Sequence, residues 1–558
     1  EKSQTVNAFS VIPCPMWKRR RSTTRSKPAS EFRNRTPSSS VLFSSKPSSP
    51  SHELENERQL VDIVVCGGGP CGLLSAIMLS QKFPSYNIKL FDERPQSPQD
   101  PDDASYWSSD LHKRYLIGLG GRGITALETF GVWNQVVAPF CQEVPRRIDW
   151  NSAQGPGPIE TIRNDKRYRT QVLPRDRLVS CLYQHITTEQ QNGNGDDGLY
   201  TNLELFYGQK VEPVKISVSK NEERVWVDVL DTSSADDSKR ESQQRQSRQK
   251  IASRFVIAAD GSTRTFANEM ERLDGISDDD ATKFRVVRYD DDNQRVYKNI
   301  PFKIPLGDNN KNQFSPGWDV NTNYAVRTDR MIFDALPAND NGDFVGVLLL
   351  MADDEMARPN VDPVFFKTFL QEQVPQFVEM FGETTIESVA ERPPSFLPRF
   401  RYITPRMHQS YRTVLMGDCA KTVKPYFGMG ANSALEDVKL LAECIDKNPQ
   451  DLYKAIGEFS DKRSPDIETL VRVSHNLDRP GVAGVFSFLV PIILDGIFSK
   501  LAPDVFAPNI ISLLQDEEIT FQNAAQRKRV DRIGQVAILS AALLLFWEGF
   551  QLVSSVLF

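Results

Sequence analysis

The sequence predicts an α/β fold in which a parallel sheet is interleaved with a second β-sheet and followed by a long apolar helix. Two glycine-rich signals, starting at Gly67 and Gly417, are 350 residues apart, and each follows a short apolar run. Residues 285–352 alternate between apolar and polar side chains, as half-buried strands do. Residues 533–558 contain a single charged side chain, Glu548.

The first signal combines a strand, a glycine turn and a helix. Residues 61–65 are mostly β-branched, which favours a buried parallel strand, and residues 73–79 favour a helix. Between them Gly67, Gly69 and Gly72 have the G-x-G-x-x-G spacing. These glycines permit a tight turn, close approach of the backbone to a pyrophosphate, and close packing of helix on strand. The diphosphate then rests on the N–H groups that begin the helix, so we expect a Rossmann-like dinucleotide site.

An acidic pair ends the next predicted strand. Residues 87–91 form that strand, and Asp92 and Glu93 follow about twenty residues after the last glycine, where a carboxylate accepts from ribose hydroxyls. A second G-x-G-x-x-G, at residues 118–123, has no β-rich run before it and no acid-tipped strand after it. We expect a loop and a helix start there, and therefore one dinucleotide fold in the chain.

The second signal indicates a flavin. Residues 414–416 predict a strand that ends at Gly417 and Asp418, where a carboxylate can accept hydrogen bonds from the ribityl chain of FAD. A glycine-rich loop then enters a helix over residues 432–446, whose first N–H groups would stabilise negative charge on the flavin pyrimidine. The expected flavin-facing residues are Pro425, Tyr426 and Phe427, and the expected cofactor-binding residues are Gly428, Gly430, Ala431 and Asn432.

Two further cofactor contacts are expected between these signals. Residues 255–258 predict a strand that ends near Asp260 and Gly261, which would place polar backbone beside the diphosphate. Arg175 could bind the flavin phosphates or the ring side of the flavin, whereas a surface ion pair is the simpler interpretation of Arg177.

Composition excludes several classes of function. Net charge is −6, and the 508 residues after residue 50 carry about −14 (57 basic, 71 acidic), which argues against a nucleic-acid partner. The seven cysteines contain no C-x-x-C pair and the five histidines do not cluster, so we expect neither a disulfide framework nor a metal site.

The two ends of the chain predict targeting to an organelle membrane. Residues 1–58 are basic at their start and rich in Ser, Thr and Pro, which indicates a transit peptide or a disordered basic arm. The segment Ala8–Pro13 slightly favours a plastid over the mitochondrial outer membrane. Residues 531–558 predict a single membrane anchor behind a basic flank at 527–532, with a buried or interfacial helix as the alternative.

The ordered motifs resemble the single-component, FAD-dependent aromatic hydroxylases. Within that group the segment Pro425–Asn432 is most similar to the kynurenine 3-monooxygenases, which read Pro-Phe-Phe-Gly-Gln-Gly-Met-Asn there. The run Arg463-Ser464-Pro465-Asp466 and the apolar C-terminus also match, and the resemblance covers about residues 60–558.

The resemblance implies additional site residues. Arg114 matches the family segment after the first βαβ unit and would contact the cofactor, Arg146 falls on the carboxylate-binding arginine, and Asn476 falls near a pocket asparagine. It also implies residues 59–480 as the FAD-binding monooxygenase domain, with a substrate sheet at about 285–400, a helical cap at 481–530 and the anchor at 531–558. The apolar stretch 485–501 could lie against the membrane or cover the active site.

The resemblance further implies the reaction. NADPH or NADH reduces FAD, O2 forms a flavin C4a-hydroperoxide, and one oxygen passes to an aromatic small molecule, so the chemistry belongs to the cofactor and requires no protein nucleophile or metal. Kynurenine is one candidate substrate. A flavin-dependent reductase or dehydrogenase of a membrane isoprenoid or pigment, and a non-catalytic flavoprotein subunit, remain alternatives.

Overall fold

The structure is a computed structural model. It describes residues 60–95, 97–98, 100–102, 115–150, 158–162, 167–192, 198–218, 222–232, 248–275, 283–289, 295–306, 314–478 and 485–557. The expected transit peptide and Arg114 lie outside the described residues.

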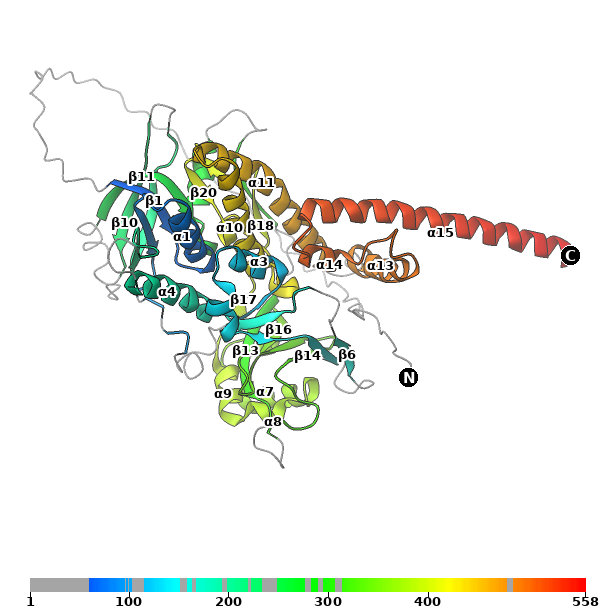
Figure 1. Ribbon diagram of the computed structural model, residues 1–558. Helices are drawn as coiled ribbons and strands as arrows, with labels where there is room; N and C mark the ends of the chain where they lie inside the picture. The colour runs from blue at the N-terminus through cyan, green and yellow to red at the C-terminus, as the bar shows by residue number, and fades with distance from the viewer. Residues whose placement is uncertain are drawn as a thin grey trace, which may run out of the picture.

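A parallel sheet forms the centre of the larger lobe (Figure 1). Its strand order is β19-β20-β11-β1-β2-β8; the last five strands pair in parallel, and β9 and β10 extend β11 as an antiparallel ribbon. The strands are β1 (Leu60–Cys66), β2 (Ile88–Asp92), β8 (Leu203–Tyr207), β9 (Gln209–Lys215), β10 (Val225–Asp231), β11 (Arg248–Ala258), β19 (His408–Gln409) and β20 (Thr413–Leu415).

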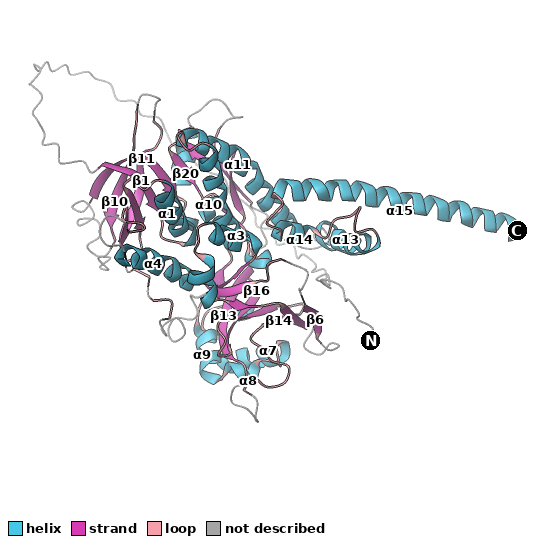
Figure 2. Cartoon of the chain, in the orientation of Figure 1, coloured by secondary structure: helices cyan, strands magenta, loops and turns pink. Residues whose placement is uncertain are grey.

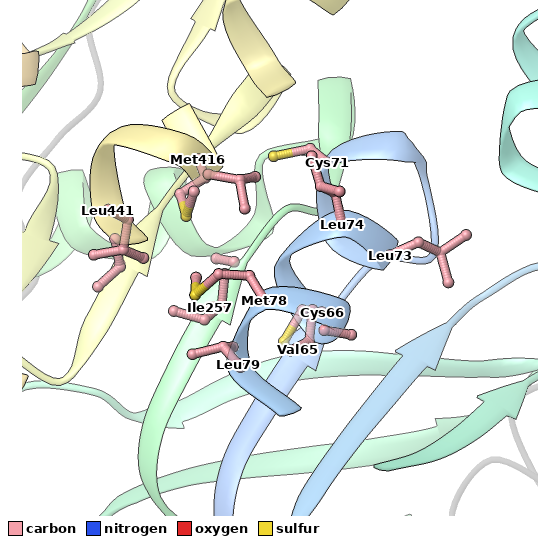
Figure 3. Close-up of a cluster of buried hydrophobic side chains, with 14 of the residues drawn as sticks. Val65, Cys66, Cys71, Leu73, Leu74, Met78, Leu79, Ile257, Met416 and Leu441 are labelled. Atoms are coloured by element: carbon pink, nitrogen blue, oxygen red, sulfur yellow. The ribbon is translucent and has the colours of Figure 1, made fainter. Parts of the chain in front are cut away.

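Apolar helices cover this sheet and form the main core. In Figure 3, Leu74 and Met78 of α1 lie beside Val65 of β1, Ile257 of β11 and Leu441 of α10. All five are buried, which explains why the strands are nearly continuous apolar runs. The helices of this lobe are α1 (Pro70–Lys82), α4 (Arg175–Asn192), α6 (Thr265–Asp274), α10 (Met429–Lys447) and α11 (Leu452–Leu477).

A second sheet lies beside the first and has its own core (Figure 2). Its order is β17-β13-β16-β15-β14-β5-β6, so it takes two strands from before the expected range 285–400. The strands are β5 (Arg146–Trp150), β6 (Ile159–Ile162), β13 (Arg295–Lys303), β14 (Thr322–Arg327), β15 (Ile332–Pro337), β16 (Asp343–Met351) and β17 (Ser395–Phe396), with helices α7 (Pro363–Gln373), α8 (Val378–Phe381) and α9 (Glu383–Glu391).

Two further sheets have three strands each. They are β3-β7-β4, made of Leu116–Leu119, Gln171–Pro174 and Gln142–Glu143, and β12-β18-β21, made of Arg285–Arg288, Arg401–Thr404 and Lys421–Thr422. The strand β3 includes the first two residues of the second G-x-G-x-x-G, so a short strand leads into this motif where a loop was expected. The expected helix start is present as α3 (Gly121–Thr129), but β3 pairs antiparallel with β7 and stays outside the parallel sheet.

The chain ends in a helix that projects from the body (Figure 1). This helix, α15 (Phe521–Leu557), has 37 residues and follows η9 (Val485–Leu489), α13 (Val490–Leu501) and α14 (Ile510–Gln515). Among the described residues it is the one helix long and apolar enough to cross a bilayer, and 6% of its most apolar window is buried. The fold class is therefore confirmed as α/β with two interleaved sheets and one long apolar C-terminal helix.

Candidate functional site

The glycine signals meet at one edge of the parallel sheet, where β1, β2, β11 and β20 end. The Gly67 N–H donates to the Phe91 carbonyl at 2.7 Å, and the Met416 N–H donates to the Ala258 carbonyl at 3.0 Å. Ligands of open α/β sheets bind outside the carboxyl ends of the strands, so motifs 350 residues apart in sequence form one candidate site.

The first glycine signal forms an open surface at the start of α1. Gly67 has φ +100°, and a Cβ there would lie 2.4 Å from the Ala259 carbonyl oxygen. A Cβ on Gly72 would lie 1.8 Å from the Gly67 oxygen, so this position admits only glycine. A Cβ on Gly69 would meet only the Arg175 guanidinium, at 3.5 Å, and no side chain caps the helix. This surface can accept a diphosphate.

The structure separates the two acidic candidates. Asp92 is buried, and its Oδ2 accepts from the Gly68 N–H at 2.6 Å, while Glu93 is exposed. Burial opposes ionisation of Asp92, but hydrogen bonds from the Arg94 side chain and from backbone N–H groups outweigh it, so the Asp92 pKa lies below its usual value. Asp92 is therefore the carboxylate that faces the glycine turn.

Arg175 and Asp418 lie close enough to influence each other across the same edge. Arg175 begins α4 beside Asp176, at 2.9 Å, and its guanidinium stabilises the ionised form of Asp418. Asp418 is exposed, yet crowding by protein desolvates it and raises its pKa, against the opposing effect of Lys421, Arg264 and Arg175. The Asp418 carboxylate is therefore accessible to a ligand, although protein atoms surround it closely.

The Asp260-Gly261 turn contributes backbone geometry and one missed residue. Asp260 Oδ2 accepts from the Thr265 N–H at 2.6 Å at the start of α6, and Gly261 has φ +63° with no atom within 4 Å of a Cβ position. Arg264 is buried and donates to the Thr422 hydroxyl and to the Cys419 carbonyl. It binds the second glycine signal to this turn, and nothing in its sequence neighbourhood indicates that role.

The flavin-facing loop precedes a second uncapped helix. Pro425 and Gly428 are exposed, whereas Tyr426 and Phe427 are half-buried. Gly428 is the N-cap of α10 with φ +65°, no side chain caps that helix, and a Cβ on Gly430 would meet open space. No side chain therefore caps the N–H groups that begin α10, as none caps those that begin α1.

Asn432 contributes its side chain as well as its place in the helix. Its Oδ1 accepts from the Gly120 N–H at 2.8 Å and the Gly123 N–H at 3.2 Å, and its Nδ2 donates to the Gly118 carbonyl at 2.8 Å. The second G-x-G-x-x-G is thus clamped against the flavin-facing loop. A Cβ on Gly123 would lie 2.4 Å from Asn432 Oδ1, so the glycine at this position of the motif allows the contact with Asn432.

A buried cluster of charges fixes the second glycine signal from behind. Asp437 accepts from the Gly417 N–H at 2.9 Å, from Lys421 at 2.5 Å and from Arg463 Nε at 2.7 Å. Arg463 also binds Glu436 and Asp466, each at 2.7 Å, and Arg122 of α3 pairs with Glu436. We call Arg122, Lys421, Glu436, Asp437, Arg463 and Asp466 the charge network.

The charge network is balanced and reaches the C-terminal helix. Burial opposes ionisation of Glu436 and Asp437, but their cationic partners outweigh it and lower both pKa values. Asp466 Oδ1 accepts from the Gln522 N–H at 2.9 Å, and the Arg122 guanidinium lies 4.2 Å from the ring centre of Phe521, the first residue of α15. The network therefore connects α3, α10, α11 and α15.

The two expected substrate residues, Arg146 and Asn476, each have partners of their own. Arg146 of β5 pairs with Glu160 of β6 at 2.7 Å and with Asp319, before β14, at 3.3 Å, so two carboxylates already neutralise it. Asn476 is exposed near the end of α11, and its carbonyl accepts from the Ser487 hydroxyl at 2.9 Å. Both assignments stay predictions.

Comparison with known proteins also indicates a protein that binds FAD. Residues 217–448 match a family model described as an FAD binding domain. The chain is 23% identical to kynurenine 3-monooxygenase of Phaeosphaeria nodorum over 421 residues (73% of this chain, 75% of the relative). It is 22% identical to the Salinispora arenicola enzyme over 478 residues (84% and 91%).

Solved structures share the fold. PqsL from P. aeruginosa, in complex with 2-aminobenzoylacetate, aligns with a TM-score of 0.53 at 16% identity, over 77% of this chain and 100% of that one. The chain is an FAD-dependent monooxygenase of the aromatic hydroxylase type. Its FAD binding domain matches the family model, and the chain is a distant homologue of the kynurenine 3-monooxygenases and aromatic hydroxylases, so the resemblance is confirmed.

Arg175→Gln should weaken FAD binding. Because the guanidinium lies over Gly69 at the start of α1, its loss should remove a charge-assisted hydrogen bond and raise the FAD dissociation constant about tenfold to a hundredfold. Titration of the apoprotein with FAD measures this. Arg272→Gln, which removes an exposed arginine paired with Glu269, is the control and should leave the constant unchanged. Equal affinities of both variants would exclude Arg175 from the cofactor site.

Arg463→Met should destabilise the chain by about 3–5 kcal/mol, because it leaves buried carboxylates without their shared partner. Arg472→Met, which removes an exposed partner of Glu468 on the same helix, should cost about 0.5 kcal/mol or less. Urea unfolding of both variants measures the difference.

The loss of unfolding free energy caused by Arg463→Met should be smaller at about pH 5 than at about pH 7. In the native chain the lowered pKa values of Glu436 and Asp437 stabilise the fold above the unfolded pKa, and this contribution is lost as pH falls through the folded pKa. Without Arg463 these carboxylates bind protons more readily in the folded state. Lowering the pH should therefore reduce the destabilisation of the variant. A pH-independent or negligible loss would contradict the role of the charge network.

Proposed function

We propose that this protein hydroxylates an aromatic or related small molecule, with NADPH or NADH as electron donor and O2 as co-substrate. The meeting of both glycine signals at one sheet edge supports this proposal, because a flavin needs its diphosphate and its ring held at fixed separation. FAD, when bound, supplies the redox chemistry that takes electrons from the nicotinamide and activates O2.

Each part of the cofactor has suitable protein groups. Gly67–Gly72 and Arg175 would hold the diphosphate, and Asp92 would accept from the ribose. Asp418 would accept from the ribityl chain. The open N–H groups of α10 would face the pyrimidine and stabilise negative charge there, while the loop 425–427 would exclude water from the reacting edge.

The homologues and the position of Arg146 support a proposal for the substrate class. The named relatives are kynurenine 3-monooxygenases, so kynurenine and other aromatic amino acids or acids are the first candidates. We propose that Arg146 exchanges Glu160 for the carboxylate of such a substrate and that Asn476 lines the substrate pocket. The pairing of Arg146 with Glu160 is exposed on both sides, which favours exchange.

We further propose that α15 anchors the protein to an organelle membrane. Every residue from Val536 to Gln551 is exposed, and the helix contains the apolar length that a bilayer requires. A plastid is favoured over the mitochondrial outer membrane by the N-terminal segment alone.

Parallel measurement of NADPH oxidation and O2 uptake by the full chain tests the proposed reaction. We expect matched consumption that kynurenine or another aromatic acid stimulates, with one atom of labelled O2 in the hydroxylated product. NADPH oxidation that reduces an isoprenoid acceptor without O2 uptake would instead establish the reductase alternative. Bound FAD that NADPH and NADH both fail to reduce would indicate a non-catalytic subunit.

Arg146→Gln should raise KM for a substrate with a carboxylate about tenfold and leave kcat within about twofold, because the loss concerns binding. Glu160→Gln is the matched variant: it removes the competing carboxylate and should lower KM. Steady-state kinetics of the three proteins measure both effects. If neither change alters KM, Arg146 only stabilises the sheet through its ion pairs.

A further inference from the structure

The outward face of α13 is apolar, although the helix lies on the surface of the protein. Ile492, Asp495 and Phe498 point inward and are buried. The opposite side has the helical spacing Val490, Ile493, Ile497 and Leu501, exposed by 38%, 50%, 49% and 77%. A surface helix normally turns its polar side to water, so this arrangement indicates a partner that is itself apolar.

We propose that this face of α13 lies in the head-group and acyl boundary of the membrane that α15 crosses, as a second lipid contact. The inference rests on the proposed anchoring by α15. It adds a second contact beside the anchor, so that two elements, and not α15 alone, attach the catalytic domain to the bilayer.

The position of α13 along α15 places it at the membrane surface. From Val536 onward α15 continues to Leu557, about 22 residues or about 33 Å at 1.5 Å per residue, which matches a hydrocarbon core of about 30 Å. Gln535, which donates to Asp495 of α13, directly precedes this segment, and the residues from Val536 to Gln551 are all exposed. The bilayer surface therefore falls at the level of α13.

Buried ion pairs hold α13 in this place. Asp495 of α13 is fully buried and binds Lys528 at 2.9 Å and Arg532 at 2.8 Å, and Gln535 donates to it at 3.2 Å. Phe506, after α13, packs close to Gly534, where a Cβ would lie 3.3 Å from its ring. Much of the basic flank that was expected to orient the anchor thus fastens α13 to α15.

The chemistry of the surrounding residues suits a lipid surface better than a protein partner. Ile533 and Val536 of α15 are exposed by 72% and 58%, so apolar side chains are also exposed where the proposed anchor begins. Lys500 and Asp504 are exposed at the end of α13, where polar side chains can reach the head groups. The charges between the helices are already paired, so placing them at the boundary leaves no carboxylate of this cluster uncompensated.

Spin labels on the full chain in phosphatidylcholine vesicles test this proposal. Leu501→Cys reports on α13, Phe546→Cys on the proposed anchor, and Lys447→Cys on the exposed end of α10 as the water control; the unsubstituted chain gives the background from native cysteines. Collision of each label with O2, which concentrates in lipid, is compared with collision with a water-soluble nickel chelate.

We expect the Leu501 and Phe546 labels to favour O2 by at least about fivefold relative to the Lys447 label. A lipid-exposed Phe546 label with a water-exposed Leu501 label would overturn the inference and leave the anchor intact. A water-exposed Phe546 label would overturn both. Spin–spin broadening at Leu501, with low accessibility to both reagents, would overturn the lipid contact in favour of a second copy of this chain.

Discussion

The buried charge network is the interaction on which the candidate site most depends. Asp437 accepts simultaneously from the Gly417 backbone, Lys421 and Arg463, so one carboxylate fixes the turn that presents Asp418. Burying a charge is costly unless it is paired, and here three basic and three acidic side chains compensate one another. The arrangement tolerates little displacement, which makes the second glycine signal a rigid part of the site.

The same network explains how distant parts of the chain act as one unit. Arg122 lies inside the second G-x-G-x-x-G, Arg463 lies on α11, and both guanidinium groups lie against the ring of Phe521 at the start of α15. Asn432 adds a second connection between that glycine motif and the flavin-facing loop. A displacement of the C-terminal helix would therefore change the positions of residues in the expected flavin-facing loop.

The sequence predicts the fold and the cofactor well because glycine spacing and apolar strands reflect local backbone requirements. Gly72 illustrates such a requirement, because a Cβ at this position would clash with the Gly67 carbonyl. Long-range side-chain pairing was not predictable: Arg264, the clamp by Asn432 and the partners of Lys528 depend on tertiary contacts. The same holds for Arg146, whose neighbours come from β6 and from the segment before β14. The sequence did not distinguish Asp92 from Glu93 as the expected ribose-binding carboxylate. In the structure Asp92 accepts from the Gly68 N–H, whereas Glu93 is exposed.

Flavin content of the purified full-length chain tests the central claim most directly, namely that both glycine signals form one cofactor site. Absorbance of the protein, followed by acid release and identification of the flavin, gives the stoichiometry. We predict one non-covalently bound FAD per chain, or one binding site when the apoprotein is titrated. A folded chain that neither retains FAD nor binds it on titration would contradict this account.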